Sequence, residues 1–177
     1  PSKPDAAPLS AKSIKNIHGV LHKALKQSVL IGYLRTNPTE ACILPRIIRK
    51  EMHPLEEDQV AVFLREVQGH PHEYLYKIAL FTGLREGEVL GLGWEHIDFQ
   101  AGTLTVKRQL RREQKKGGEY YFSPPKNNKS RCLTLAPSVI QLFRLQKLEQ
   151  NSMRMETCDA WQENGLVFSN QTGGYLS

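Results

Sequence analysis

The stretch FTGLREGEVLGLGWEHIDF, residues 81–99, shows how this chain is organised. An apolar segment typical of a helix ends at Gly83, an arginine follows, and a second apolar segment begins. Glycine takes a positive backbone dihedral without steric cost, so Gly83 lets the chain turn between two packed helices. The turn directs Arg85 outward beside the first free N–H groups of the next helix, where an anion is favoured. Because a charge at such a seam is costly unless it is paired, Arg85 needs either a local partner or an anionic substrate.

Glu88 is the local candidate, because it follows Arg85 by three residues and lies on the same side of the expected helix. A pairing between the two side chains would account for the arginine by itself. A guanidinium fork also fits two phosphate oxygens at once. The spacing therefore leaves both a structural ion pair and a phosphate site open.

Helical patterns precede and follow this seam. Residues 55–67 carry acidic side chains in their first turn and apolar side chains at helical spacing, which predicts an amphipathic helix. Residues 73–82 are more apolar and predict a buried helix. After the seam, we expect the helix to resume through residues 86–94.

Downstream of the seam, the pattern changes to an alternation of apolar and polar residues, which is typical of strands. Pro137 then takes the first position of a last amphipathic helix. The sequence therefore predicts an α+β fold, mainly helical, with a three-stranded antiparallel sheet. The three expected strands are residues 103–110, 119–123 and 130–135.

The part before residue 55 has a different pattern. Residues 11–35 predict an amphipathic helix with a basic outer side, which Ser10 caps at its N-terminus. Residues 37–54 contain three prolines and predict an extended connection between two domains.

Charge is concentrated in two zones, although 24% charged and 40% hydrophobic residues are ordinary for a soluble globular protein. Residues 1–54 hold nine Lys or Arg against three acidic residues, and residues 107–131 hold nine against two. The formal net charge of +6 therefore favours a polyanionic partner, although most charge runs are simply solvated surface.

Several classes of function find no support in the sequence. No apolar run approaches membrane-spanning length, and the first ten residues lack the apolar core of a signal peptide. We expect the chain to be a piece of a longer protein, because it begins without Met. Three cysteines without metal-type spacing favour a reduced, cytosolic setting. His18 and His22 have the spacing of a helical metal pair but lack a third ligand, so we interpret them as surface residues.

Lys126 is the second candidate for chemistry. It lies at the entrance to an expected strand, on the connection in PPKNNKSRCLTL, residues 124–135. A lysine there can reach a neighbouring site while its backbone stays anchored in the sheet. The alternative is a solvated loop lysine, which is common in surface connections.

Three stretches together resemble the tyrosine recombinases, the phage-type integrase family, and especially integrases of phages and conjugative elements of low-GC Gram-positive bacteria. Residues 81–99 resemble the first conserved box of the family, residues 124–135 its lysine-bearing β-hairpin, and residues 10–38 the final helices of its core-binding domain. The resemblance implies three parts. Residues 1–45 would be the C-terminal helices of a core-binding, SAM-like domain, residues 46–54 a linker, and residues 55–177 the N-terminal part of a truncated catalytic domain.

The resemblance also implies a reaction. A tyrosine attacks a DNA phosphodiester to form a 3′-phosphotyrosyl link, and a 5′ hydroxyl later reverses the step, without cofactor or metal. Arg85 matches the first catalytic arginine, and Lys126 matches the catalytic lysine, a general acid to the leaving 5′ oxygen. Glu88 matches the acidic position that supports the arginine. The family's His-x-x-Arg pair and nucleophilic tyrosine are expected beyond Ser177. Tyr175 falls too early in the sequence to be that nucleophile. We therefore expect this piece alone to bind DNA weakly and not to cut it.

Partners and location follow from the same resemblance. The implied partners are double-stranded DNA attachment sites and three further copies of the full-length protein, in the bacterial cytoplasm at the nucleoid, with no membrane. Two other functions stay open. Residues 84–97 would serve as a helix-turn-helix in a non-enzymatic DNA-binding regulator, or the chain would be a helical interaction module. The side chains expected to contact DNA are Lys12, Lys15, Lys23, Lys26, Arg108, Arg111, Arg112, Lys129 and Arg131.

Overall fold

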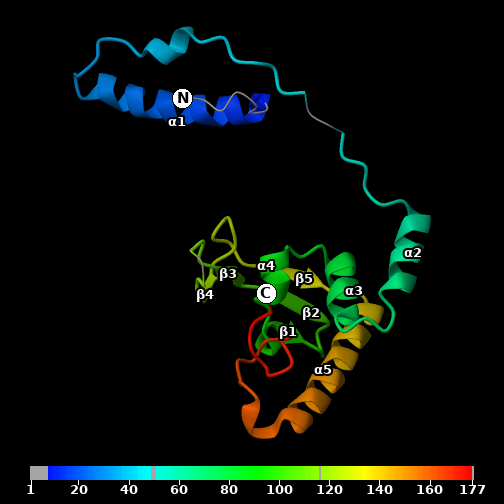
Figure 1. Cartoon of the computed structure of the whole chain (residues 1–177). Helices are drawn as coiled ribbons and strands as arrows, with labels where there is room; N and C mark the ends of the chain where they lie inside the picture. Colours follow the sequence, from blue (N-terminus) through cyan, green and yellow to red (C-terminus); the bar gives the residue numbers. More distant parts are fainter. Residues whose placement is uncertain (1–7, 49–50, 116, 177) are drawn as a thin grey trace. The chain divides into compact units, whose positions relative to one another are not determined.

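The computed structural model describes residues 8–48, 51–115 and 117–176, and the chain divides into two compact units, Pro1–Pro54 and Leu55–Ser177 (Figure 1). The first unit contains α1 (Ala11–Leu30) and the 3-10 turn η1 (Pro38–Ala41). The second contains α2 (Glu57–Glu66), α3 (Glu73–Thr82), α4 (Glu86–Leu90), η2 (Trp94–His96), β1 (Ile97–Asp98), β2 (Thr103–Val106), β3 (Gln109–Arg112), β4 (Tyr120–Ser123), β5 (Arg131–Thr134), α5 (Pro137–Thr157) and η3 (Cys158–Ala160).

Helix α1 begins where the sequence predicts. The Ser13 N–H donates to Ser10 Oγ at 3.1 Å, which caps the helix, and the helix ends at Leu30, before Gly32 at φ +83°. No residue of α1 is buried in the part of the chain that the structure describes. Apolar side chains of this helix are accordingly exposed, with Ile17, Leu21 and Leu30 at 58%, 50% and 72%.

The segment after α1 is not wholly extended, so that part of the prediction was wrong. Asn37 caps the turn η1, because the Thr39 N–H donates to Asn37 Oδ1 at 3.1 Å. The two histidines of α1 hold this turn: His18 Nε2 lies 3.0 Å from the Thr39 carbonyl oxygen, and His22 Nδ1 lies 2.8 Å from Thr39 Oγ1. They connect α1 to η1 and, within the described residues, belong to no group that could hold a metal ion.

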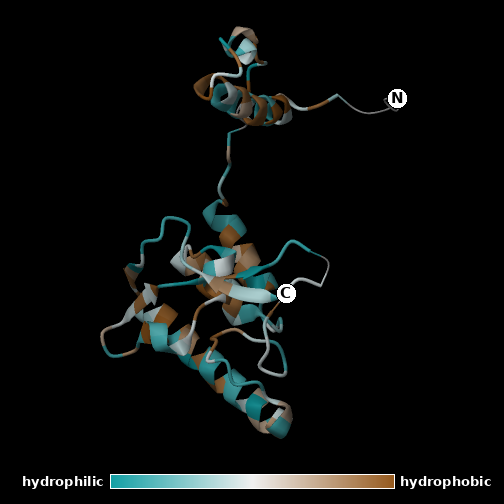
Figure 2. Ribbon diagram, turned by 90° about the vertical axis from the view of Figure 1, so that its left-hand side faces the viewer, coloured by the Kyte–Doolittle hydropathy of each residue, from teal (hydrophilic) through white to brown (hydrophobic). Residues whose placement is uncertain are grey.

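In the second unit, one apolar core joins the helices to the sheet. Ile78 of α3 and Phe143 of α5 are fully buried against Leu104 of β2, together with Val89 of α4 and Val167. Figure 2 shows hydrophobic residues gathered where these elements meet, while the outer part of α5 is largely hydrophilic. Helix α5 begins at Pro137 as predicted. None of the helices among the described residues is both long enough and apolar enough to cross a bilayer.

The strands pair differently from the prediction. A three-stranded antiparallel sheet exists, but its order is β1-β2-β5, and β3 and β4 form a separate two-stranded hairpin. The expected strand over residues 103–110 is therefore two strands, with a break at residues 107–108. Leu104 and Val106 occupy the core-facing positions of β2, and Arg108 would be next on that face. The Arg108 guanidinium instead stays outside the apolar core, where Nη2 lies 3.1 Å from Glu95 Oε1 and Nε donates to the Gly91 carbonyl oxygen.

Helix α4 is only five residues long, so the prediction that it continues to residue 94 was wrong. A Cβ atom at Gly91 would lie 2.7 Å from the backbone nitrogen of Leu110, so glycine allows the end of α4 to lie directly against β3. Between Gly91 and the turn η2, Gly93 is extended. The Val167 N–H donates to the Leu92 carbonyl oxygen at 2.9 Å, and Gly93 forms a single bridge with Leu166.

Candidate functional site

The turn between α3 and α4 has the geometry that the sequence predicts. Gly83 is left-handed at φ +63°, and its N–H donates to the Ala79 carbonyl oxygen at 3.0 Å, which closes α3. Leu84 is buried and anchors the turn in the core. Arg85 follows in extended conformation, with 62% of its side chain exposed.

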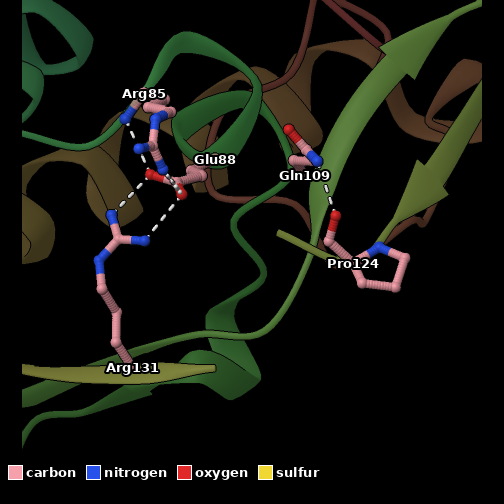
Figure 3. A network of polar contacts seen from close by, with 5 residues as sticks. All are labelled: Arg85, Glu88, Gln109, Pro124 and Arg131. Atoms are coloured by element: carbon pink, nitrogen blue, oxygen red, sulfur yellow. Dashed lines mark hydrogen bonds and ion pairs between the residues drawn. The ribbon is translucent and has the colours of Figure 1, made fainter. Parts of the chain in front are cut away.

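Glu88 lies at the centre of a polar network below this turn (Figure 3). Its carboxylate, 1% exposed, accepts two parallel hydrogen bonds from Arg131: Nη1 to Oε1 at 2.8 Å and Nη2 to Oε2 at 2.7 Å. It also accepts the Arg85 N–H at 2.9 Å and Arg85 Nη1 at 3.2 Å. One buried carboxylate therefore binds Arg85, which immediately precedes α4, and Arg131 of β5.

The electrostatics of this network follow from the contacts. The hydrogen bonds from Arg131, together with those from Arg85, lower the pKa of Glu88 to about 2, although burial acts in the opposite direction. The hydrogen bonds to Glu88 in turn raise the pKa of Arg131. Glu88 is therefore ionised at neutral pH, and the two guanidinium groups around it leave a net positive charge.

The depressed pKa of Glu88 predicts how stability depends on pH. Because the folded value of about 2 lies below the ordinary value of 4.5, ionised Glu88 stabilises the fold above pH 4.5, and this contribution is lost as the pH falls toward 2. It corresponds to about 3 kcal/mol. Chemical denaturation at pH 7, 5, 4 and 3 measures it. The difference in unfolding free energy between the wild type and Glu88→Gln should shrink across this range, and a constant difference would contradict the assignment.

Arg85 faces an open cleft of about 560 Å³, and Lys126 lines the same cleft. Residues 125–131, the connection between β4 and β5 and the start of β5, form its other side. The lining falls wholly within the described residues and contains four cationic side chains but no Asp or Glu. The lining residues are Gly83, Arg85, Pro125, Lys126, Asn127, Lys129, Ser130 and Arg131.

Local contacts fix the backbone around Lys126. Pro125 is buried, and the Asn128 N–H donates to its carbonyl oxygen at 2.8 Å, so Lys126 is the second residue of a tight turn. Immediately before this turn, Gln109 Nε2 donates to the Pro124 carbonyl oxygen at 2.6 Å (Figure 3). The lysine side chain is exposed, but its main chain is held on both sides.

The other cations of the second basic zone lie elsewhere. Arg108 Nε donates to the Gly91 carbonyl oxygen at 2.9 Å, and its guanidinium lies 4.2 Å from the centre of the Phe122 ring. It therefore holds the β3–β4 hairpin to the end of α4 and does not line the cleft. Arg112 donates to the Gly118 carbonyl oxygen at 3.1 Å, and together with exposed Arg111 it lines a separate pocket of about 410 Å³.

The four lysines predicted to contact DNA from the first unit lie on α1. Lys12, Lys23 and Lys26 are exposed, and Lys15 is half-buried.

Sequence reasoning missed two features of the site. It assigned Arg131 to DNA, whereas the structure pairs this side chain with Glu88 as well as placing it at the cleft. It gave Gln109 no role, because a polar residue in a strand carries no sign of a contact with residue 124. Tyr175, which the sequence excluded as a nucleophile, lies against Tyr120 with 5.2 Å between ring centres and the two rings tilted by 32°.

The helix-turn-helix alternative requires a recognition helix within residues 84–97, all of which the structure describes. That stretch contains the five-residue α4 and the three-residue turn η2, in which His96 is buried. Neither element is long enough to enter a major groove as a recognition helix. The structure therefore gives this alternative no support.

Comparison with known sequences places the same region in one family. The model of the phage integrase family matches residues 48–176. A tyrosine recombinase XerC-like protein of Caldanaerobacter subterraneus is 27% identical over 183 residues, which cover 94% of this chain and 47% of that protein. An integrase of Streptomyces ambofaciens is 27% identical over 176 residues, covering 95% of this chain and 44% of that protein. The chain thus spans about half the length of these curated relatives.

Solved structures agree on the fold. The integrase of the transposon Tn1549 in complex with transposon right-end DNA superposes with a TM-score of 0.77 at 25% identity, covering 96% of this chain and 54% of that one. A lambda integrase dimer bound to a core site gives a TM-score of 0.61 at 20% identity, covering 94% and 41%. The arrangement of helices and sheet is therefore that of these proteins.

Proposed function

The chain belongs to the phage integrase family, and on that premise we propose that it forms part of a site-specific DNA recombinase that cleaves and rejoins DNA through a 3′-phosphotyrosyl intermediate. The observation that carries this proposal is the cleft. Arg85 and Lys126 lie 41 positions apart in the sequence and line one cavity without a carboxylate. Such a surface favours an anion with several oxygens, which a DNA phosphodiester provides.

The contacts suggest a role for each side chain. The exposed guanidinium of Arg85 donates to the non-bridging oxygens of the scissile phosphate and stabilises the charge that develops there. Glu88 accepts the Arg85 N–H and so holds the Arg85 main chain in place, while it also accepts hydrogen bonds from Arg85 Nη1 and Arg131. Lys126 gives a proton to the 5′ oxygen as the bond from phosphorus to that oxygen breaks. The tyrosine that attacks phosphorus is a family expectation, and no tyrosine lines the cleft.

The proposal extends to the organisation of the protein. Residues 1–45 are the end of a core-binding domain, residues 46–54 a linker, and residues 55–177 the first part of a catalytic domain. The division of the chain between Pro54 and Leu55 supports this assignment. In the complete protein we propose a tetramer on two duplex attachment sites, at the bacterial nucleoid. The exposed lysines of α1 and the cations of the cleft then contact the DNA backbone.

Binding of duplex DNA by this chain should weaken steeply as salt is added, because phosphate contacts release counterions. Lys129→Gln should reduce the magnitude of the negative slope of log K against log salt concentration by about 1, because this lysine lines the cleft. Fluorescence anisotropy with a labelled duplex at four salt concentrations measures the slope.

Arg154→Gln is the matched control for this experiment. It removes the same charge from α5, where Arg154 Nη1 lies 2.8 Å from Glu163 Oε2, away from the lining of the cleft. The control should keep the wild-type slope. Equal slopes for the two variants would contradict the assignment of the cleft as a phosphate-binding surface.

A further inference from the structure

Hydrogen bonds to other elements hold the loop that carries Lys126 at both of its ends. From these contacts we propose that Gln109 and Arg131 are positioning residues, which set where the Lys126 ammonium stands relative to Arg85. The inference rests on the proposed function, because the two residues would hold the proposed catalytic groups Lys126 and Arg85 in position. The loop runs from the end of β4 at Ser123 to the start of β5 at Arg131.

Gln109 holds the first end of the loop. Its backbone pairs with Ser123, the last residue of β4, and its side-chain amide donates to the next carbonyl oxygen, that of Pro124, at 2.6 Å. The side chain thus extends the hydrogen bonding of the hairpin one residue past the end of the strand. Gln109 is only 9% exposed, and the prolines at 124 and 125 limit the freedom of the adjoining main chain. Lys126 follows directly after this fixed segment.

Arg131 holds the second end. It is the first residue of β5, and its two parallel hydrogen bonds to Glu88 join the end of the loop to α4 (Figure 3). A bidentate contact fixes orientation as well as distance. The same carboxylate accepts the N–H of Arg85, so a single buried group sets the position of the loop and of the catalytic arginine together.

Loss of the Gln109 contact and loss of the Arg131 contact should have different effects on cleavage. The Gln109 contact touches only the segment before Lys126, so its loss should disturb proton donation alone. The Arg131 contact also restrains Glu88 and through it Arg85, so its loss should disturb both proton donation and charge stabilisation. Since a displacement of about 1 Å in a catalytic group can lower a rate about 100-fold, both losses should be measurable.

A substrate that needs no proton on its leaving group separates these effects. The experiment uses the complete recombinase that contains this chain, with ordinary DNA and with DNA whose scissile phosphate has sulfur in the 5′-bridging position. In the second substrate the phosphorus–sulfur bond breaks and the thiolate departs unprotonated. Gln109→Met, which keeps the length of the side chain without the donor, should cleave ordinary DNA about 10- to 100-fold more slowly and the sulfur substrate at the wild-type rate. Arg131→Met should be slow on both.

Gln146→Met is the matched control for Gln109→Met. Gln146 is also a glutamine with 9% exposure whose Nε2 donates to a backbone carbonyl oxygen, that of Val167, at 3.1 Å, but it lies on α5 outside the cleft. This variant should lower the melting temperature of the protein and leave the ratio of the two cleavage rates unchanged. A loss specific to ordinary DNA in Gln109→Met is therefore not a consequence of reduced stability.

The outcomes distinguish this inference from the proposed function. If the sulfur substrate does not restore cleavage by Lys126→Ala, the lysine is not the general acid. That result contradicts the proposed function itself, and the inference that rests on it falls with it. The inference is overturned if the sulfur substrate rescues Lys126→Ala but Gln109→Met keeps the wild-type ratio of the two cleavage rates, as Gln146→Met does. It is also overturned if Gln109→Met cleaves both substrates more slowly by the same factor. Rescue of Gln109→Met by sulfur together with slow cleavage of both substrates by Arg131→Met supports it.

Discussion

Arg85→Ala is expected to lower the rate of strand cleavage by the complete recombinase about 100- to 1,000-fold or more, and to change DNA affinity far less. Removing a donor that stabilises charge in a transition state costs about 3–4 kcal/mol, whereas one phosphate contact among many adds little to binding. The structure supports this expectation, because the Arg85 guanidinium is 62% exposed at the cleft. Single-turnover cleavage and anisotropy with the same duplex measure the two quantities.

Arg154→Ala is a close control, since Arg154 is 58% exposed and also pairs with one glutamate. It should cleave DNA at the wild-type rate. Arg85→Lys tests the geometry, because an ammonium keeps the charge but cannot present the planar fork of a guanidinium. Wild-type cleavage by Arg85→Ala would contradict its role at the scissile phosphate.

The second large effect is expected for Lys126→Ala. On ordinary DNA this variant should cleave about 100- to 10,000-fold more slowly, because a positioned general acid contributes that much to a rate. On DNA with sulfur in the 5′-bridging position it should regain most of the loss, since a thiolate leaves without a proton. Parallel single-turnover reactions on the two substrates provide the measurement.

Lys129→Ala is the control for this pair of reactions. Lys129 lines the same cleft and lies on the same loop, so its removal lowers the local charge equally. We expect weaker binding and no preferential recovery on the sulfur substrate. If Lys129→Ala recovered and Lys126→Ala did not, the proton donor would have been assigned to the wrong lysine.

The network around Glu88 shows that the local pairing of Arg85 exists and leaves most of the Arg85 side chain exposed. The spacing of Arg85 and Glu88 fits a structural ion pair and also a phosphate site. In the structure Arg131 makes the bidentate contact, whereas the side chain of Arg85 makes a longer contact of 3.2 Å and stays largely exposed. The glutamate therefore supports the arginine without occupying all of its donors. The ion pair is therefore compatible with the proposed phosphate site, because Arg131 shares the carboxylate and leaves donors of Arg85 available.

Some parts of this protein were determined by the sequence alone. The cap at Ser10, the end of α3 at Gly83 and the start of α5 at Pro137 all lie where the sequence predicts them. Each depends on the backbone preference of one residue and on hydrogen bonds within a few positions of it. Arg85 and Lys126 stood out by their positions in the sequence, but their catalytic roles came from a resemblance to a family, which compares motifs and does not calculate contacts.

Only the tertiary structure decided how distant segments combine. The sequence predicts strands near residues 103–110 and 119–123 but not that the first divides between two sheets, because that division depends on Arg108 meeting the carbonyl oxygen of Gly91. Likewise, the partners Glu88 and Arg131 lie 43 positions apart, and Gln109 and Pro124 lie 15 apart. Nothing local distinguishes a guanidinium that will bind a buried carboxylate from one that will face solvent. The distinction arises when packing brings the two groups together and removes the water that would otherwise solvate them.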